Sequence, residues 1–445
     1  MCSFKLRPSK LSRYFCENLK IMQFKNTAEF AKKLDAQDKL ASYKDEFIFP
    51  VINEKEVIYF TGNSLGLQPK RSQKYVNEIM NDWGGLAVEG HFKAEKPWWD
   101  YHERLAAPLA KVVGAKPEEV TVMNTLTVNL HLLMVSFYRP SAKRFKIICE
   151  EKAFPSDQYM LASQVRFHGF NPEEAIVEVK KRDGENHWHL EDILKTIEEV
   201  GDELALVLIG GVNYYNGQVF DIRTITEAGQ KQGAFVGWDL AHAAGNIKLQ
   251  LHNWGVDFAA WCSYKYMNSG PGNASGIFVN EKYLDRKDIP RFEGWWGTKK
   301  ETRFLMEPEF EPMPNAEAWQ ISNAPVLSMA PYLASLSLFD EVNMDLLIEK
   351  SKLLTAYLEF VLHEIDVELG ETTIFEIITP KDRGCQLSVF LHGQGKALFD
   401  YLMKNGVITD WREPNVIRLA PTPFYNSFEE MYRFGQILKQ GILEN

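Results

Sequence analysis

This 445-residue sequence contains no long apolar run, few cysteines and no excess of basic residues. No stretch approaches the roughly eighteen apolar residues of a membrane span, so an integral membrane protein is not expected. The five cysteines lack the paired spacing of metal ligands, and we expect no metal centre. The 50 basic residues against 60 acidic ones give a net charge of −10, which argues against nucleic-acid binding as the main activity.

What remains is the composition of an ordinary globular protein, with 45% hydrophobic and 25% charged residues. The length exceeds the size at which a single core usually stops growing. We predict an N-terminal segment at residues 1–60 that packs on the smaller domain, a large domain at 61–325 and a smaller C-terminal α/β domain at 326–445. Reduced core cysteines and the absence of a secretion signal predict a cytoplasmic protein.

Residues 1–21 differ from the rest of the chain in charge. They contain five basic residues and one acidic residue, without the continuous apolar core of a secretion signal. Two interpretations stay open. Either Met22 is the true start of translation, or the segment is a transit peptide, because such peptides are basic and nearly free of acidic residues.

Three short apolar runs predict neighbouring strands of a parallel sheet, at residues 205–209, 234–238 and 258–261. Each is followed by polar or glycine-rich sequence, which is typical of strands buried on both faces. Asp239 follows the second run, and Lys265 comes shortly after the third. Because the carboxyl ends of parallel strands meet at one edge of a sheet, Asp239, His242 and Lys265 should line one crevice.

An aspartate and a lysine at such an edge match the requirements of pyridoxal phosphate. The aldehyde of this cofactor needs an amine for its Schiff base, and its pyridine nitrogen needs a carboxylate to stay protonated. Taken singly, a lysine after a strand is usually a surface charge, and Asp-x-x-His is usually a loop or a helix cap. Together, Lys265 and Asp239 favour the cofactor.

A candidate phosphate site lies earlier in the chain. Residues 120–123 predict a strand, and the apolar spacing of residues 128–137 predicts a helix shortly after it. The free amides and the dipole of a helix N-terminus bind anions, and a hydroxyl of Thr125 or Thr127 would add a donor. The alternative is an ordinary helix cap at Asn124 or Thr125.

Another cofactor contact is expected after the apolar strand predicted at residues 145–149. Phe154 is placed to stack on a pyridine ring, and Asp157 to add a polar contact. The alternative is that Phe154-Pro155-Ser156-Asp157 is a simple turn, since proline and serine are common turn residues.

The C-terminal third predicts the smaller α/β domain. A long helical pattern at 329–365 is followed by a strand-like run at 385–391, a helix at 396–404 and a strand at 416–420. Ser427 and Glu430 carry the sequence signature of a capping box, which predicts the start of a final helix.

Short motifs in matching order over most of the chain make it resemble the kynureninases, which are pyridoxal phosphate hydrolases of fold type I in the aspartate aminotransferase superfamily. The motifs are Gly62-Asn63-Ser64-Leu65-Gly66, Phe154-Pro155-Ser156-Asp157, Asp239-Leu240-Ala241-His242, Ser263-Tyr264-Lys265-Tyr266-Met267-Asn268, Gly294-Trp295-Trp296-Gly297, Ile321-Ser322-Asn323 and Arg418-Leu419-Ala420-Pro421. The resemblance implies a large domain with a mostly parallel, seven-stranded type of sheet flanked by helices. It also implies a homodimer with shared active sites.

The resemblance implies roles for individual residues. Lys265 matches the Schiff-base lysine, Asp239 the partner of the pyridine nitrogen, and Tyr264 a candidate general acid close to the phosphate. Further matches to cofactor-binding positions are Leu126, Thr127, Phe154, Asp157, His242, Trp295 and Asn323. Trp295 and Asn323 would be donated across the dimer interface.

Substrate-binding positions are matched by Ser64, His91, Ser322, Asn323 and Arg418. The planar fork of Arg418 suits a carboxylate. His91 and Asn323 offer hydrogen bonds to a ring hydroxyl, which favours 3-hydroxykynurenine, although His91 is also interpretable as a surface-loop histidine. The chain departs from the family at Gly210-Gly211, where a serine often contacts the phosphate, so that backbone amides would replace this contact.

The implied activity is hydrolysis of kynurenine or 3-hydroxykynurenine to anthranilate or 3-hydroxyanthranilate plus alanine, in tryptophan catabolism and NAD biosynthesis. Three alternatives stay open. A cysteine desulfurase shares the fold but needs an exposed, mobile cysteine, whereas Cys385 resembles strand interior. An aminotransferase needs a keto-acid partner. A catalytically silent binding protein is disfavoured because Lys265, Tyr264 and Arg418 are all present.

Overall fold

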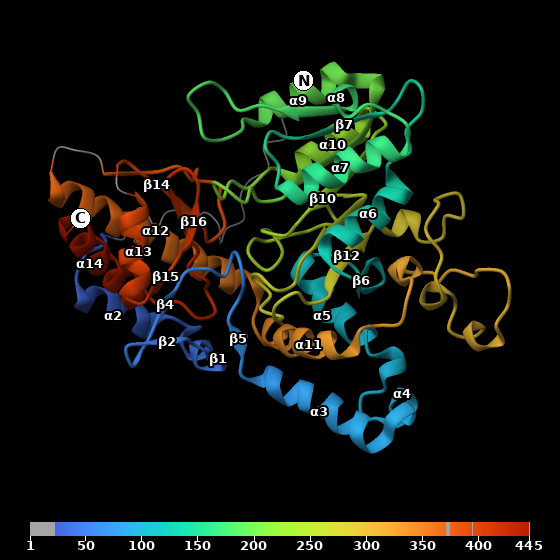
Figure 1. Ribbon diagram of the computed structural model, residues 1–445, viewed down its shortest axis with the longest axis horizontal. Coiled ribbons are helices and arrows are strands. Elements are labelled where there is room, and N and C mark those ends of the chain that lie inside the picture. Colours follow the sequence, from blue (N-terminus) through green and yellow to red (C-terminus); the bar gives the residue numbers. More distant parts are fainter. Residues whose placement is uncertain (1–22, 371–373, 394, 445) are drawn as a thin grey trace.

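A seven-stranded sheet forms the centre of the computed structural model, which describes residues 23–370, 374–393 and 395–444 (Figure 1). The strand order is β6 (Val120–Met123), β12 (Ser275–Val279), β11 (Phe258–Trp261), β10 (Phe235–Asp239), β9 (Leu204–Gly210), β7 (Lys146–Glu150) and β8 (Ile176–Val179). β12 runs antiparallel to both of its neighbours, and the other pairings are parallel. The predicted mostly parallel sheet is confirmed, and each predicted strand of this region lies within one or two residues of its expected bounds.

Helices cover both faces of this sheet, which explains the continuous apolar runs. In β9, Val207 and Ile209 point into one core, and Leu206 and Leu208 point into the other. The first core is shared with α5 (Glu103–Val113), α9 (Leu190–Val200), α10 (Ile222–Lys231) and α11 (Val326–Glu341), and the second with α6 (Leu126–Phe137) and α7 (Pro155–Phe167). A strand buried on both faces needs apolar side chains at successive positions rather than at alternate ones.

The C-terminal part of the chain forms a second, antiparallel sheet beside the first (Figure 1). Its order is β13 (Phe375–Ile377), β14 (Leu387–Leu391), β17 (Val416–Leu419) and β16 (Asp410–Arg412), and it packs with α12 (Met344–Leu369), α13 (Gly395–Lys404) and α14 (Phe428–Glu444). The same core contains α2 (Ala28–Gln37) and β4 (Ile58–Tyr59), and β4 pairs with β15 (Val407–Ile408). The division into domains at residues 60 and 325 stays a prediction.

The start of α14 is capped by its own side chains and by a side chain of α2. The amide of Glu430 donates to Ser427 Oγ at 3.2 Å, and the amide of Ser427 donates to Glu430 Oε2 at 3.1 Å. The predicted capping box is therefore confirmed. In addition, the carboxylate of Asp35 accepts from the amides of Phe428 and Glu429 at 2.7 and 2.9 Å, so a side chain of α2 satisfies two further first-turn amides.

The single helix predicted at residues 329–365 is wrong, because the segment forms two helices, α11 and α12, that break at Asn343. The Asn343 side chain accepts from the amide of Asp345 at 2.8 Å and caps α12. α11 packs against α3 (Arg71–Leu86) and α5, whereas α12 belongs to the C-terminal core. The strand expected from residue 385 begins at Leu387.

Residues 1–21, for which the two interpretations stay open, lie outside the described residues. Among the helices of the described ranges, none combines the length and apolar composition needed to cross a bilayer.

Candidate active site

A cavity of about 390 Å³ opens at the carboxyl edge of the central sheet. Its volume falls within the range of about 300–1,000 Å³ that is typical of small-molecule sites. The cavity is lined by most of the residues expected from the sequence, namely Ser64, Leu126, Thr127, Phe154, Asp157, Asp239, His242, Tyr264, Lys265 and Arg418. The predicted convergence of Asp239, His242 and Lys265 on one crevice is confirmed, and the roles of the ten residues stay predictions.

Three adjacent parallel strands end in residues that line this cavity. β7 ends in Glu150, β9 in Gly210 and β10 in Asp239. The amide of Gly210 lies 3.3 Å from both carboxylate oxygens of Glu150, and the amide of Gly211 donates to the Asp239 carbonyl at 2.8 Å. Both amides therefore already have acceptors within the chain, and which backbone amides replace the serine contact to the phosphate stays a prediction.

Glu150 was not expected from the sequence, and it is buried at the cavity wall. Burial raises the pKa of this carboxyl to about 7, although the Gly210 amide opposes the shift. The side chain of Glu150 lies 3.1 Å from the position that a Cβ on Gly210 would take. The missing side chain at Gly210 thus leaves room for a carboxyl that changes charge near neutral pH.

Asp157 and Asp239 form a buried carboxyl pair joined by a hydrogen bond. Burial raises the pKa of Asp157 well above its usual range, and the charge of Asp239 adds to this effect. Burial also raises the pKa of Asp239, but the hydrogen bonds from Asp157 and from the Ala241 amide, at 2.7 Å, oppose that rise. We therefore place the shared proton on Asp157, which leaves Asp239 as the carboxylate.

Lys265 and His242 form the second polar pair in the cavity, with 3.0 Å between Lys265 Nζ and His242 Nε2. Burial, together with the positive charges of Lys265 and Arg418, holds the pKa of His242 well below its usual range. The neutral imidazole then accepts from the ammonium at Nε2, so Nδ1 carries the hydrogen. Nδ1 is buried and has no hydrogen-bond partner within the described part of the chain.

The loop that carries Lys265 packs tightly on the Gly62–Gly66 motif. The Gly66 amide donates to the Tyr264 carbonyl at 2.8 Å. A Cβ on Gly66 would lie 2.4 Å from the Lys265 carbonyl oxygen and 2.1 Å from Asn268 Oδ1. The glycine is therefore required for close approach, and two motifs far apart in the sequence form one structural unit.

The N-terminus of α6 forms the end of the cavity expected to bind a phosphate. Thr125 occupies the N-cap position but makes no side-chain capping bond. Asn124 Nδ2 instead donates to Asn129 Oδ1 at 3.2 Å. Thr125, Leu126 and Thr127 all line the cavity, so the first-turn amides and hydroxyls lie where an anion would bind.

Arg418 enters the cavity from β17 of the C-terminal sheet. Its Nη1 donates to the Tyr214 carbonyl at 2.6 Å, and its Nη2 forms an ion pair with Asp410. Asp410 also accepts from Ser64 Oγ at 3.0 Å and from Arg412 at 3.4 Å. Nε of Arg418 is buried without a partner among the described residues, and its N–H, together with the second N–H of each Nη nitrogen, remains for a ligand.

An aromatic wall closes another side of the cavity. Phe154 lies at the N-cap of α7, and its ring meets the ring of Tyr214 edge to face, with 5.2 Å between centroids. Asn63, Glu150, Tyr214 and Arg412 line the cavity but were not predicted. Only Asn63 lies inside a motif already noted, so it alone had a sequence signal.

The pKa of Tyr264 is shifted in the direction opposite to the one that its expected acid–base role requires. Burial raises this pKa, and the neighbouring Cys262 adds to the effect. Tyr264 is therefore a protonated phenol that donates hydrogen bonds at neutral pH.

Four of the expected residues, His91, Trp295, Ser322 and Asn323, are not among the residues lining the cavity and are called the outer group. Ser322 and Asn323 are exposed, and Trp295 is 41% exposed. His91 lies on α4 (Gly90–Lys93), with its Nδ1 3.0 Å from the carbonyl of Val88, which precedes that helix. Trp295 Nε1 donates to the Arg303 carbonyl at 3.1 Å. One chain alone does not bring these four residues to Lys265.

The cavity residues fit pyridoxal phosphate. The open α6 amides match the phosphate, Asp239 matches a protonated ring nitrogen, and Lys265 provides the amine. Three buried polar atoms of the cavity have no hydrogen-bond partner within the described ranges, namely Asp157 Oδ1, His242 Nδ1 and Arg418 Nε. Buried polar atoms in proteins are usually hydrogen-bonded, so a bound ligand would supply the missing partners.

A desulfurase mechanism does not fit the three cysteines of the described residues. Cys149, Cys262 and Cys385 are all buried. Burial raises the pKa of Cys385 to about 12, so its thiol is neither exposed nor ionised, as a nucleophilic cysteine must be.

Comparisons with known proteins agree with this geometry. The family description "Kynureninase C-terminal domain" matches residues 347–438, and "Aminotransferase class-V" matches residues 58–373. A kynureninase of Christiangramia forsetii is 74% identical over 425 residues, which cover 95% of this chain and 100% of that protein. A kynureninase of Flavobacterium johnsoniae is 72% identical over 425 residues, with the same coverage.

A solved structure shares the fold at much lower identity. It is a C-DES variant with glycine covalently linked to the PLP cofactor, and it superposes with a TM-score of 0.72 at 14% identity, covering 86% of this chain and 96% of that one. The sequence relatives and the family match together show that the chain belongs to the kynureninase family, the pyridoxal-phosphate-dependent hydrolases built on the aminotransferase class-V fold.

Proposed function

We propose that this chain hydrolyses the bond between the β and γ carbons of kynurenine or 3-hydroxykynurenine, releasing anthranilate or 3-hydroxyanthranilate and alanine. The observation that carries the proposal is that Lys265, Asp239 and Arg418 line one cavity. These three residues provide an amine, a carboxylate for a pyridine nitrogen and a guanidinium for an amino-acid carboxylate.

The residues proposed to hold pyridoxal phosphate are spread around the cavity. The α6 amides and Thr127 bind the phosphate, Phe154 contacts the ring face, and Asp239 holds a proton on the ring nitrogen. When bound, the cofactor supplies an electron-withdrawing ring that takes up the electron pair left when the α-carbon of an amino acid loses its proton.

Lys265 is the proposed base that removes this α-proton with its Nζ. His242 supports that role because its neutral imidazole accepts a hydrogen bond from Nζ at 3.0 Å and orients the amine. Tyr264 keeps its own proton, because its pKa is raised. Its hydroxyl is therefore proposed to donate to an oxygen of the cofactor or substrate rather than to act as a base.

Arg418 is the proposed site for the α-carboxylate of the substrate. Two of its nitrogens already contact Asp410 and the Tyr214 carbonyl, which fixes the plane of the guanidinium. Asp410 in turn accepts from Ser64 Oγ, so Ser64 is proposed to orient this pair next to the substrate. The arrangement presents a rigid fork rather than a flexible point charge.

The proposed activity is tested with protein purified in pyridoxal phosphate. Kynurenine and 3-hydroxykynurenine are added separately, and the aromatic product and alanine are both quantified. Equal amounts of the two products from wild type, and none from Lys265→Ala, are expected. A bound cofactor spectrum without cleavage of either substrate would exclude this function while leaving the cofactor assignment intact.

The active sites are proposed to be shared within a homodimer. Two members of the outer group lie beside exposed apolar rings, with 6.3 Å between the ring centroids of His91 and Phe92 and 5.7 Å between those of Trp295 and Phe304. A further apolar groove of about 570 Å³ lies beside the loop of Lys265, lined in part by Leu67, Val76 and Pro271. Apolar surface of this extent, next to residues that the family places in the active site, supports burial against a second copy.

Subunit complementation distinguishes a shared site from an unshared one. Lys265→Ala and Asn323→Ala chains are mixed, unfolded and refolded together. Shared sites predict one intact site per mixed dimer, and hence recovery of about a quarter of wild-type activity. The matched control is a mixture of Lys265→Ala with Asp239→Ala, which should recover none. Absence of recovery in the first mixture would contradict the shared site.

Cytoplasmic localisation is also proposed. It is supported by the three described cysteines, which are buried and unpaired, because free thiols persist in reducing compartments. Cell fractionation of the source organism, with detection of the native protein, tests this point.

A further inference from the structure

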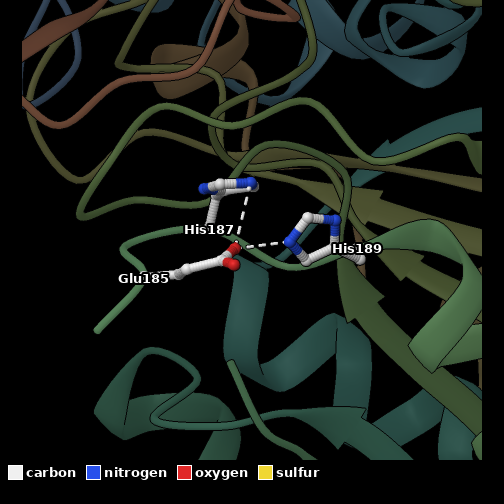
Figure 2. Close-up of side chains that lie close together, drawn as sticks. All are labelled: Glu185, His187 and His189. Atoms are coloured by element: carbon white, nitrogen blue, oxygen red, sulfur yellow. Dashed lines mark hydrogen bonds and ion pairs between the residues drawn. The ribbon is translucent and has the colours of Figure 1, made fainter. Parts of the chain in front are cut away.

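A second cluster of chemically capable side chains lies away from the cavity, in the loop between β8 and α9 (Figure 2). Glu185, His187 and His189 point toward one another. His187 Nε2 lies 3.4 Å from Glu185 Oε2, His189 Nε2 contacts the same oxygen, and the two imidazole centroids are 4.6 Å apart. All three ligand-type atoms lie within 4.8 Å of one another.

The backbone beneath this cluster is fixed by the residue between the two histidines. Trp188 is buried, and its Nε1 donates to the Val179 carbonyl at 2.8 Å. Gln218 bonds both the amide and the carbonyl of Trp188, at 2.8 and 2.7 Å. Because Trp188 is anchored inward, its two neighbours both project outward, and the imidazoles are held together at little further entropic cost.

Two comparable clusters in the described part of the chain already contain a cation. In the cluster of His102, Glu103 and Glu317, Lys300 forms an ion pair with Glu103. In the cluster of Glu119, His252 and Glu281, Lys116 forms an ion pair with Glu281. These lysines supply the positive charge that a metal would otherwise bring.

The Glu185 cluster differs in this respect. Among the described residues, Glu185 makes ion pairs with the two histidines but with no lysine or arginine. The nearby Arg182 is engaged by Glu191 and Asp192. The contact with His189 lowers the pKa of Glu185, which favours the carboxylate form that a cation requires.

We propose that Glu185, His187 and His189 form a binding site for one divalent transition-metal ion of the Zn²⁺, Ni²⁺ and Cu²⁺ class. Two imidazole nitrogens and one carboxylate oxygen suit these ions, whereas Mg²⁺ and Ca²⁺ prefer all-oxygen sites. Ligand atoms around tetrahedral zinc lie about 3.3 Å apart, so small side-chain rotations suffice. Water completes the coordination, since the three side chains are partly exposed. The absence of cysteine ligands explains why cysteine spacing gave no sign of this site.

The site is tested by calorimetric titration of chelator-treated holoenzyme with ZnCl₂ in a buffer that does not bind zinc. Wild type should bind about one equivalent that is absent from the double variant His187→Ala/His189→Ala. Each single variant, and Glu185→Gln, should bind this equivalent at least about tenfold more weakly. The matched control is His363→Ala, which removes an exposed histidine of α12 and should bind like wild type.

A second measurement identifies the ligands directly. Electron paramagnetic resonance of the protein with one equivalent of Cu²⁺ should show hyperfine structure from imidazole nitrogens, which the double variant should lose. Unchanged zinc stoichiometry and an unchanged copper spectrum in a double variant with wild-type circular dichroism would overturn the proposal.

Discussion

The cavity residues at the sheet edge and the outer group are both recognisable as motifs in the sequence, but the fold brings only the cavity residues together. Lys265, Asp239 and His242 come from adjacent strand ends and are brought together within one chain. His91, Ser322 and Asn323 remain outside that cavity. The topology of a parallel sheet brings the first set together, whereas one chain alone leaves the second set outside the cavity. The difference separates the residues that one chain assembles around Lys265 from those that the family resemblance assigns to the site but that one chain leaves apart from it.

The largest expected effect comes from removing the amine of the cavity. Lys265→Ala should lower kcat by more than about a thousandfold, because no other described side chain in the cavity offers an amine. The visible absorption band of the bound cofactor should change in the same variant. His91→Ala, from the outer group, is the matched comparison and should retain most of its activity. A Lys265→Ala enzyme that keeps a tenth of wild-type kcat would show that the cavity amine is no more important for the reaction than the outer group.

The next effect concerns stability and tests the buried carboxyl that the sequence did not reveal. The pKa of Glu150 is raised from 4.5 to about 7 in the folded chain. As pH rises, the unfolded chain loses this proton first, so the folded state loses about 3 kcal/mol of stability between pH 4.5 and 7. Below pH 4.5 the contribution is fully present.

Glu150→Gln should remove this pH dependence. Denaturant unfolding of the cofactor-free protein at pH 5 and pH 8 measures it, and wild type should lose more stability than the variant over that interval. Glu198→Gln, at an exposed position of α9, is the control and should behave like wild type. Parallel curves for wild type and Glu150→Gln would show that the carboxyl is not shifted.

A smaller effect is expected where the C-terminal sheet meets the cavity. Arg418→Lys should raise KM by about 30-fold, since a lysine cannot keep the bonds to Asp410 and Tyr214 and also bind a carboxylate, a loss of about 2 kcal/mol. Arg412→Lys is the control, because Arg412 lines the same cavity but is more exposed. An unchanged KM in a folded Arg418→Lys enzyme would remove the proposed carboxylate site.

The smallest effect is expected in the outer group. His91→Ala should change the ratio of kcat/KM for 3-hydroxykynurenine over kynurenine by about fivefold, because one hydrogen bond to a hydroxyl contributes about 1 kcal/mol. The absolute rate with kynurenine should change little. An unaltered ratio would show that His91 is only a surface histidine and would remove the outer group's role in substrate selection.

The site residues that could be predicted from the sequence are those that come just after short apolar runs. A strand buried on both faces has an unmistakable composition, and the next polar residue then falls at a known edge. Asp239 and Lys265 could be placed for this reason. Glu150 ends such a run as well, but a lone glutamate after a strand carries no chemical signature until its neighbour Gly210 is seen beside it.

Other features depended on tertiary contacts that no local pattern encodes. Arg412 and Asp410 come from a short strand of the C-terminal sheet that reaches the cavity only after the two sheets pack together. The break between α11 and α12 did have a local signal, the capping Asn343. That signal was outweighed by apolar spacing that continues at helical period through residues 329–365.

The pairing of β4 with β15, and the Asp35 bonds to the start of α14, have a consequence for synthesis. The ribosome releases α2 and β4 more than 300 residues before their partners exist. Through that interval Ala31, Leu34, Ile58 and Phe60 have no core to enter, whereas the central sheet already has its own. α2 and β4 are thus synthesised well before the C-terminal core but fold only with it, and in the meantime their apolar side chains are exposed to aggregation.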